Sequence, residues 1–572
     1  MTDTLRRWLV DTIAEHTGIT PEPDHPLGDY GLSSRQAVGI AADLEERLGR
    51  RLPATLLWES PTIDHLVRTL TGADEPAARP GTDRRRTDPI AVVGLGCRFP
   101  GADGPDEFWD LLRAGRDAVR TAPPGRWSAE AAPVVGGFLD DVAGFDAEHF
   151  GITPREAATM DPQQRMLLEV TWAALEHAGI APVSLRGSRT GVFTGIATHD
   201  YGHLTMTGGA PDLWTATGAA GSIAANRLSY VYDLRGPSMA VDTACSSSLV
   251  AVHHAVRALR DGDADLALAA GVNLMLLPGP TAAFAAAGLL AGDGRCKTFS
   301  AAADGIARAE GCGVVVLKRL ADAECDGDRV LAVIRSSAVN SDGRSNGLAA
   351  PNPAAQQAML RDAYRSLDPS TVDYVEAHGT GTLLGDPIEA RALGAVLGTG
   401  RRPDAPLLIG SVKTNIAHAE AAAGIAGVIK VVLSLQHGEL PPQLHFAAPN
   451  PHIPFGELGL RVVTEPTPWP RRGGRAVAGV SAFGFGGTNA HVVLEEAAPP
   501  GAAADGSPLE TAARQNGGIR IGLLSARTHD RLTERAAQLA AWLDSPAGRR
   551  SSPADVTHTL FRRDNHGPHR AA

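Results

Sequence analysis

Residues 241–255 read VDTACSSSLVAVHHA, and this stretch decides how the chain can fold. β-Branched residues lead through small side chains into an apolar run at helical spacing, which predicts a strand that turns sharply into a helix. Cys245 then stands at the start of that helix, where free backbone N–H groups and the helix dipole lower the pKa of a thiol. Because most unpaired cysteines are small core residues, this stretch alone leaves nucleophile and core residue as equal alternatives.

The same pattern of strands and helices extends over residues 88–497. Short buried strands such as IAVVGLG, TGVFTGIA and GCGVVVLKRL alternate with alanine-rich helices. This alternation predicts a layered α/β protein.

The two ends of the chain differ from this central part. Residues 1–72 repeat apolar side chains at helical spacing, which predicts a small helical bundle. Residues 73–87 and 498–518 have the composition of linkers. Residues 519–572 read as a strand, an amphipathic helix and a basic stretch, too short to bury a core alone.

Composition and charge exclude several classes of protein. The net charge is -11 and no basic stripe carries interleaved aromatic residues, so we expect no nucleic-acid partner. The 5 cysteines form no CxxC pair, so neither a disulfide framework nor a metal site is expected. The sequence contains neither a signal peptide nor a run of 18 apolar residues, so we expect a cytoplasmic protein with no membrane partner. Residues 1–72 hold 11 acidic against 7 basic residues, an acidic surface suited to docking on other proteins.

Three later segments place further reactive groups in loops. EAHGTGTLLGDPIEA carries His378, with Asp386 and Glu389 just downstream, and KTNIAHAEAAAGIAG carries Lys413 and His418. GVSAFGFGGTNAHVVLEE is a glycine-rich strand and turn that can supply backbone N–H donors to a developing oxyanion. One thiol and two imidazoles in such loops indicate nucleophilic chemistry on a thioester.

TACSSSLV, EAHGTGTLLGDPIE, KTNIAHAEAAAG and SAFGFGGTNAHV together resemble the signature set of β-ketoacyl synthases in modular polyketide synthases. Their spacing agrees as well, since His378 lies 133 residues after Cys245 and His418 lies 40 residues after His378. The segments DPIAVVGLGCRFPGA, ITPREAATMDPQQRMLLE and DGRCKTF extend the likeness across residues 88–497.

This resemblance implies a thiolase-like α/β/α/β/α fold of two similar halves that forms a homodimer. Cys245 would take an acyl chain from a carrier. His378 and His418 would hold a malonyl-type thioester, stabilise the enolate left by loss of CO2, and so support a decarboxylative Claisen condensation.

The resemblance also implies supporting roles. Backbone N–H groups of Cys245 and Phe485 would form the oxyanion hole, with the Phe485 ring as a gate beside the thiol. Lys413 would pair with Asp386 or Glu389 to order the loops.

Other positions bear on the substrate. The resemblance implies that Thr380 and Thr382 hydrogen-bond the pantetheine arm. Ala417 and Ala419 stand where Gly and Leu are more typical, which leaves the shape of the pocket open.

DYGLSSRQAVGIAADLEERLG resembles the segment of acyl carrier proteins in which a serine receives 4'-phosphopantetheine from a phosphopantetheinyl transferase. Ser34 matches that serine, and Ser33 stands where Asp is usual. A serine at this place is otherwise an ordinary N-cap. The segments GLSSRQAV and WESPTI are similar to those of starter carriers, which are loaded by a fatty acyl-AMP ligase.

Residues 519–572 resemble part of the adaptor between a ketosynthase and an acyltransferase. No GHSxG-type acyltransferase motif is present in the sequence. We therefore expect the acyltransferase domain elsewhere in the parent enzyme or supplied in trans.

Three other functions stay open at this point. A transacylase or gatekeeper would lack the histidine of HGTGT, and a decarboxylase would carry Gln in place of Cys245. A carrier and docking scaffold would be indifferent to Cys245→Ala.

Overall fold

The computed structural model separates the chain into two units, Met1–Asp83 and Arg84–Ala572. It describes residues 2–25, 27–30, 34–50, 52, 56–59, 62–71, 88–127, 134–206, 212–345, 347–498, 521–563 and 567–572. The predicted linker 73–87, and all of the predicted linker 498–518 except residue 498, lie outside the described residues.

The first unit is a small helical bundle, as the sequence predicts. The predicted stripe Leu5, Leu9 and Ile13 is buried, and it packs with apolar residues of the later helices. An ion pair of 2.7 Å between Arg6 Nε and Asp64 Oδ1 ties the first helix to the last. The elements are α1 (Thr2–Thr17), η1 (Leu27–Tyr30), α2 (Ser34–Leu48), α3 (Leu56–Glu59) and α4 (Ile63–Thr71).

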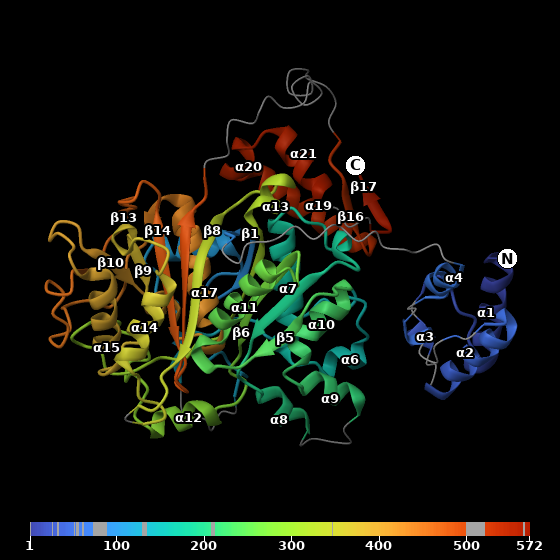
Figure 1. Ribbon diagram of the computed structural model, residues 1–572, viewed down its shortest axis with the longest axis horizontal. Coiled ribbons are helices and arrows are strands. Elements are labelled where there is room, and N and C mark those ends of the chain that lie inside the picture. Colours follow the sequence, from blue (N-terminus) through green and yellow to red (C-terminus); the bar gives the residue numbers. More distant parts are fainter. Residues whose placement is uncertain are drawn as a thin grey trace. The chain divides into compact units, whose positions relative to one another are not determined.

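The second unit is built on one eleven-stranded sheet, in the order β12-β10-β9-β14-β15-β8-β1-β7-β6-β4-β5 (Figure 1). Each half has parallel strands outside and antiparallel strands inside, and the halves meet where β1 pairs with β8. The strands are β12 (Leu460–Val462), β10 (Leu407–Gly410), β9 (Tyr374–Glu376), β14 (Val477–Phe483), β15 (Thr488–Glu496), β8 (Ala332–Ser341), β1 (Ile90–Arg98), β7 (Gly311–Arg319), β6 (Leu266–Asn273), β4 (Thr190–Gly195) and β5 (Ser238–Val241).

Helices cover both faces of this sheet and so create the layers. Successive side chains of β1 alternate between two cores, with Val92 in the central one and Val93 in an outer one. The central layer holds α11 (Ser247–Asp261) and α17 (Ala423–His437), whereas the outer layers hold α7 (Pro162–His177) and α10 (Ile223–Tyr232) on one half and α14 (Pro353–Ala363) and α15 (Gly385–Leu393) on the other.

Smaller elements fill the loops between these layers. They include α5 (Pro105–Arg113), β2 (Arg120–Thr121), β3 (Val135–Gly136), α6 (Pro154–Thr159), η2 (Pro182–Leu185), α8 (Asp200–Met206), α9 (Leu213–Ala219), η3 (Ala244–Ser246), α12 (Gly279–Ala286), α13 (Leu320–Cys325), η4 (Pro369–Thr371), η5 (Gly394–Gly398), α16 (Lys413–Ile416), η6 (Glu420–Ala422), β11 (Glu439–Leu440) and β13 (Thr467–Pro468). Among the described helices, none combines the length and the apolarity that a membrane span requires.

Within the second unit, the C-terminal segment packs on the sheet-bearing body through few apolar contacts. Its buried apolar side chains are Leu532 and Leu560. Arg535 pairs with Glu176 at 2.8 Å, and Arg562 pairs with Asp328 at 3.1 Å. The segment comprises β16 (Leu524–Ala526), α19 (His529–Asp544), α20 (Pro546–Arg550), α21 (Pro553–Arg562) and β17 (His569–Ala571).

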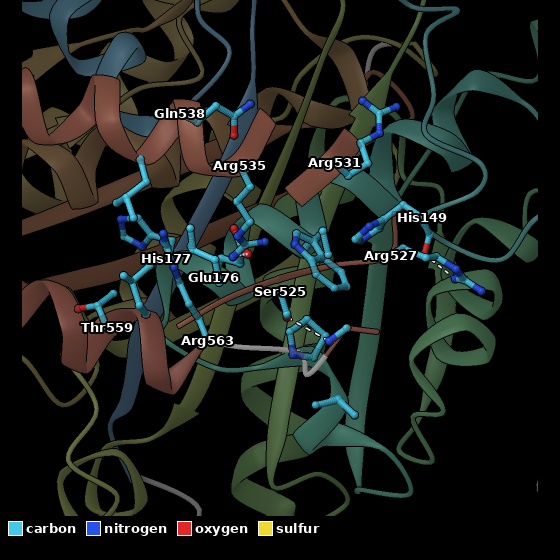
Figure 2. A pocket seen from close by; sticks show the side chains of 18 of the residues that line it. His149, Glu176, His177, Ser525, Arg527, Arg531, Arg535, Gln538, Thr559 and Arg563 are labelled. Atoms are coloured by element: carbon cyan, nitrogen blue, oxygen red, sulfur yellow. Dashed lines mark hydrogen bonds and ion pairs between the residues drawn. The ribbon is translucent and has the colours of Figure 1, made fainter. Parts of the chain in front are cut away.

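A cavity of about 1430 Å³ separates this segment from the sheet-bearing body (Figure 2). Aromatic residues and arginines share its lining, with Trp172 and Tyr232 on the body and Trp542 on α19. None of the site residues predicted from the sequence lines it. The cavity therefore marks a loosely packed contact between segments, and the predicted reactive groups gather elsewhere.

Candidate active site

Cys245 lies in a strained turn between β5 and α11. The residue before it, Ala244, has φ +56°, a left-handed conformation that costs a non-glycine residue free energy. Side chains hold the turn, since the Ala244 N–H donates to Asp242 Oδ1 at 2.9 Å and the Thr243 N–H donates to Ser247 Oγ at 2.9 Å. The turn leaves the thiol half-buried, one residue before the N-cap of α11.

The environment of Cys245 corrects one expectation from the sequence. Burial, reinforced by the nearby charge of Glu420, raises the pKa of the thiol to about 12. Lys413 and the backbone N–H groups of Phe485 and Cys245 lower the pKa, but by less. Desolvation therefore outweighs the helix start, and the thiol is protonated at neutral pH.

His378 follows β9 in a loop fixed by α15. The backbone N–H groups of His378 and Gly379 donate to the two carboxylate oxygens of Glu389, each at 2.8 Å. The carboxylate of Asp386 accepts from the Phe299 N–H at 2.6 Å and from the Gly381 N–H of the same loop at 3.1 Å. Both carboxylates are buried, so they set the path of the loop from inside the protein.

The predicted ion pair of Lys413 with these carboxylates is wrong. No ion pair within 4.0 Å joins Lys413 to Asp386 or Glu389, all three of which the structure describes, and backbone N–H groups bond both carboxylates instead. Lys413 acts at longer range: its charge lowers the pKa of Cys245, His378 and His418.

His418 sits between two further residues with positive φ, Ala417 at +64° and Glu420 at +47°. Its Nδ1 accepts a hydrogen bond of 3.0 Å from the Glu420 N–H. Its Nε2 is buried and has no partner among the described groups. Burial places the pKa of His418 well below its usual value, so the ring is neutral and its hydrogen is on Nε2.

His378 shares this arrangement. Its Nδ1 accepts from the Phe483 N–H at 3.4 Å, and burial lowers the pKa of the ring well below its usual value. The neutral ring therefore also carries its hydrogen on Nε2. The two rings are nearly perpendicular, with centroids 5.5 Å apart, so the structure brings together two neutral imidazole donors from loops that are distant in the sequence.

Phe485 occupies the tip of the β14–β15 hairpin. The residue is 60% exposed, and its ring meets the ring of Phe284 on α12 edge to face, with centroids 6.5 Å apart. Its backbone N–H interacts with the sulfur of Cys245. A Cβ on the preceding Gly484 would lie 2.2 Å from the Thr243 carbonyl oxygen, so only glycine lets the hairpin approach the cysteine turn this closely.

Thr380 and Thr382 lie on the same loop as His378. Their hydroxyl oxygens are 3.2 Å apart, and Thr382 Oγ1 also accepts from the Gly385 N–H at 3.1 Å. The two hydroxyls thus form a small polar group on the loop that carries the first histidine.

Buried charges that the sequence analysis did not single out surround the site. Lys430 Nζ pairs with Glu376 Oε2 at 2.7 Å, and the Val412 N–H donates to the same carboxylate at 2.5 Å. Glu376 therefore joins the strand before His378 to the residue before Lys413. A lysine inside the apolar run VIKVVLSL was the signal that could have revealed such a pair.

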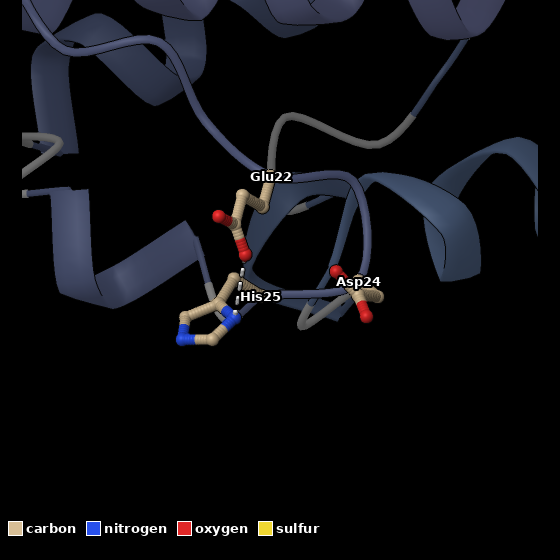
Figure 3. Close-up of side chains that lie close together, drawn as sticks. All are labelled: Glu22, Asp24 and His25. Carbon is tan, nitrogen blue, oxygen red and sulfur yellow. Dashed lines mark ion pairs between the residues drawn. The ribbon is translucent and has the colours of Figure 1, made fainter.

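Ser34 is the first residue of α2, and its side chain lies outside the described residues, as does Ser33 altogether. The start of a helix suits an attachment point, because a group bound there does not have to fit between the side chains of the following turns. In the same unit the exposed residues Glu22, Asp24 and His25 lie close together (Figure 3). The exposed side chains of Glu22 and His25 are 3.6 Å apart, from Oε2 to Nδ1.

Family models match most of the chain. Residues 87–323 match "Beta-ketoacyl synthase, N-terminal domain", residues 331–447 match "Beta-ketoacyl synthase, C-terminal domain", and residues 449–570 match "Ketoacyl-synthetase C-terminal extension". Residues 7–70 match "Phosphopantetheine attachment site".

Curated relatives belong to polyketide synthases. The chain is 53% identical over 583 residues to a phenolphthiocerol/phthiocerol polyketide synthase protein of Mycobacterium tuberculosis, covering 97% of this chain and 30% of the relative. It is 47% identical to a spectinabilin polyketide synthase system protein of Streptomyces orinoci, covering 96% of this chain and 15% of the relative. The chain thus spans about three tenths or less of the length of these relatives.

Solved structures give the same result for the fold. The ketosynthase from module 6 of the Bacillus subtilis bacillaene synthase is 39% identical with a TM-score of 0.75, covering 83% of this chain and 81% of that one. An oxazolomycin ketosynthase domain from Streptomyces albus is 41% identical with a TM-score of 0.76, covering 83% of this chain and 85% of that one. The predicted thiolase-like fold is confirmed.

Proposed function

This chain belongs to the β-ketoacyl synthase family, as a ketosynthase of a modular polyketide synthase that carries an acyl carrier protein, and we propose that Cys245, His378 and His418 perform its condensation. The observation that supports this assignment most strongly is the pair of neutral imidazoles, each with Nδ1 held as an acceptor and a hydrogen left on Nε2. Two such donors suit one thioester oxygen that gains negative charge.

The first step is acylation of Cys245. The sulfur attacks the carbonyl carbon of an acyl thioester, a new carbon–sulfur bond forms, and the bond to the departing sulfur breaks. Because the thiol of the free enzyme is protonated, its proton leaves with that departing sulfur. The N–H groups of Cys245 and Phe485, which interact with the cysteine sulfur, are the donors for the oxyanion of this step.

The second step uses both histidines. A malonyl-type thioester binds with its carbonyl oxygen at the two Nε2–H groups and loses its carboxylate as CO2, and the electron pair of the broken bond forms an enolate. The enolate carbon attacks the acyl carbon on Cys245, a carbon–carbon bond forms, and the sulfur of Cys245 is released. Burial, supplemented by the charge of Lys413, keeps both imidazoles neutral and thus ready to donate.

The remaining polar residues serve the substrate arm. Phosphopantetheine on Ser34 supplies a terminal thiol that carries acyl groups as thioesters. Thr380 and Thr382 offer the hydroxyls that hydrogen-bond such an arm, and the exposed ring of Phe485 is placed to act as a gate.

Variants in each half-reaction test this assignment. Cys245→Ala should abolish acylation, whereas His418→Ala should leave acylation within about twofold and slow condensation by about 100-fold or more. His254→Ala, which changes a histidine of α11 that has no assigned role, is the control. Condensation by the Cys245→Ala protein would refute the assignment.

We further propose domain borders at 1–72 for the carrier, 88–497 for the ketosynthase and 519–572 for a partial adaptor. The acyltransferase that supplies extender groups would then belong to the parent enzyme or act in trans. This is supported by the match to the mycobacterial relative, because the match covers only 30% of that relative and most of its length lies outside the matched region.

The source of the starter group is a separate proposal. The carrier segment resembles starter carriers, so a fatty acyl-AMP ligase would load Ser34 with a carboxylic acid. The holo-protein should gain the mass of a fatty acyl group when incubated with such a ligase, ATP and fatty acids. Loading with malonyl-type groups alone would exclude a starter role.

Homodimer formation is proposed from the edge of the sheet. Among the described strands β5 pairs with β4 on one side and with none on the other, and its Met239 is 39% exposed. Tyr230 on the neighbouring α10 is 79% exposed. An unpaired edge with apolar residues suits a second copy of the chain.

Sedimentation of the full chain tests the dimer. Met239→Lys should yield monomers, because it places a charge on that edge. Leu543→Lys changes a residue of matching exposure, 41%, on α19 and should remain dimeric. A wild-type chain that sediments as a monomer at micromolar concentration would contradict the proposal.

A further inference from the structure

Glu420 has a conformation that needs an explanation. It is a non-glycine residue at φ +47°, two positions after His418. In this conformation its backbone N–H reaches back to His418 Nδ1 at 3.0 Å. Because a left-handed residue of this kind costs free energy, other contacts must hold it in place.

Arg308 supplies those contacts from a segment 112 residues away. Its guanidinium binds both carboxylate oxygens of Glu420, Nε to Oε1 and Nη2 to Oε2, the latter at 3.1 Å. The Arg308 side chain is 3% exposed and that of Glu420 is 15% exposed, so water competes little for this pair.

The backbone around Arg308 also holds His418 directly. The His418 N–H donates to the Ala307 carbonyl at 2.8 Å, and the Ala309 N–H donates to the His418 carbonyl at 2.8 Å. The Arg308 segment therefore fixes the main chain of His418, while the Arg308 side chain fixes the residue that bonds the ring.

The same guanidinium also contacts α12, whose Phe284 packs against the Phe485 ring. Arg308 Nη1 donates to Thr281 Oγ1 at 2.5 Å, and the guanidinium carbon Cζ lies 5.4 Å from the centre of the Phe284 ring. Phe284 in turn meets the ring of Phe485, whose backbone N–H interacts with Cys245. One buried cation thus connects the second histidine to the residue beside the thiol.

We propose that Arg308 and Glu420 are positioning residues: their ion pair holds the Glu420 N–H on His418 Nδ1, which keeps the Nε2 hydrogen directed at the substrate. This inference rests on the proposed function of His418. Neither residue touches the reacting atoms. The pair consequently matters for the step that uses His418, decarboxylative condensation, and much less for acylation of Cys245.

The test compares the two half-reactions in the full chain. Acylation of Cys245 is followed by intact mass with an acyl N-acetylcysteamine thioester, and CO2 release from malonyl N-acetylcysteamine is followed with the acylated protein. Glu420→Ala should lower kcat for CO2 release about tenfold with KM within about twofold, and acylation should change less than about twofold. Glu420→Gln, whose amide oxygen still accepts from Arg308, should recover most of kcat.

Two further variants complete the test. Arg308→Lys keeps the charge but loses the two-pronged contact, so it should show the same selective loss. Glu156→Ala is the matched control, because Glu156 is 16% exposed and pairs with the buried Arg227 at 2.5 Å; its two half-reactions should keep the wild-type ratio.

The outcomes separate the inference from the proposed function. Equal loss in both half-reactions, or no loss in Glu420→Ala and Arg308→Lys proteins of unchanged Tm, would overturn the positioning role. A wild-type protein that acylates Cys245 but releases no CO2 would instead overturn the proposed function of the histidines.

Discussion

At the scale of single residues, the site depends on how burial changes acidity. Burial raises the pKa of Cys245 to about 12 and lowers the pKa of both His378 and His418 well below the usual value. All three groups are therefore uncharged at neutral pH. An uncharged site suits a reaction in which a thioester approaches first and charge develops only afterwards.

The acidity of Cys245 leads to a prediction about pH. With a pKa of about 12, roughly one thiol in 10⁵ is ionised at pH 7, so alkylation by iodoacetamide should accelerate about tenfold per pH unit between pH 7 and pH 9. Intact mass at timed intervals measures the rate, and Cys245→Ala identifies the signal. A rate that levels off below pH 8 would mean that the thiolate is stabilised far more than we infer.

At the scale of elements, loops held by buried groups bring the reactive residues together. The β14–β15 hairpin reaches the cysteine turn because Gly484 has no side chain, and α15 fixes the His378 loop through Glu389. Because these contacts are buried, they fix the positions of the loops against the strands and helices of the core.

The hairpin gives the second prediction. Gly484→Ala places a Cβ 2.2 Å from the Thr243 carbonyl oxygen, so the hairpin must shift away from Cys245 and kcat/KM for acylation should fall about tenfold or more. Gly486→Ala adds a Cβ with no atom within 4 Å and should leave kcat/KM within about twofold. Similar kinetics of the two variants would show that the close approach is unimportant.

The C-terminal segment gives the third prediction. Its helices are held by partly exposed ion pairs and lie beside a large cavity, whereas α11 and α17 are buried on most faces. Amide hydrogens of α19 and α21 should exchange faster than those of α11 and α17, and 1 M NaCl should accelerate only the former. Equal protection of the two pairs, measured by mass spectrometry, would contradict a loosely held segment.

At the scale of the whole molecule, two units have separate cores. The carrier core of Leu9, Ile13 and their neighbours shares no residue with the three cores of the ketosynthase. Calorimetry should therefore record two transitions, and Leu9→Ala should lower the stability of the carrier alone by about 2–5 kcal/mol. A single transition that shifts as a whole in Leu9→Ala would show that the units unfold together.

Much of this architecture could be predicted from the sequence. The stretch around Cys245 predicts its strand, turn and helix, and the apolar stripe of Leu5, Leu9 and Ile13 predicts a carrier helix, because both patterns are local. The buried partners of the site could not be predicted in this way. Arg308 and Glu420 are 112 residues apart, and only the packed fold brings such charges together.

Two expectations failed for physical reasons. The helix start at Cys245 suggested a stabilised thiolate, but desolvation is the larger effect. The charge of Lys413 suggested an ion pair with Asp386 or Glu389, but the fold does not bring its ammonium group within 4.0 Å of either, and backbone N–H groups bond both carboxylates instead. Both errors arise because burial and backbone hydrogen bonds are not readable from residue types.

Above all, we propose that Cys245 holds the growing chain and gives it up to a carbon–carbon bond. The decisive test is mass spectrometry of the peptide containing Cys245, after an acyl thioester and again after a malonyl thioester. We expect an acyl mass on Cys245 that disappears in the second step as a β-ketoacyl product forms. An acyl mass on Cys296 or Cys325 instead, or one that persists on Cys245 without product, would contradict the proposal.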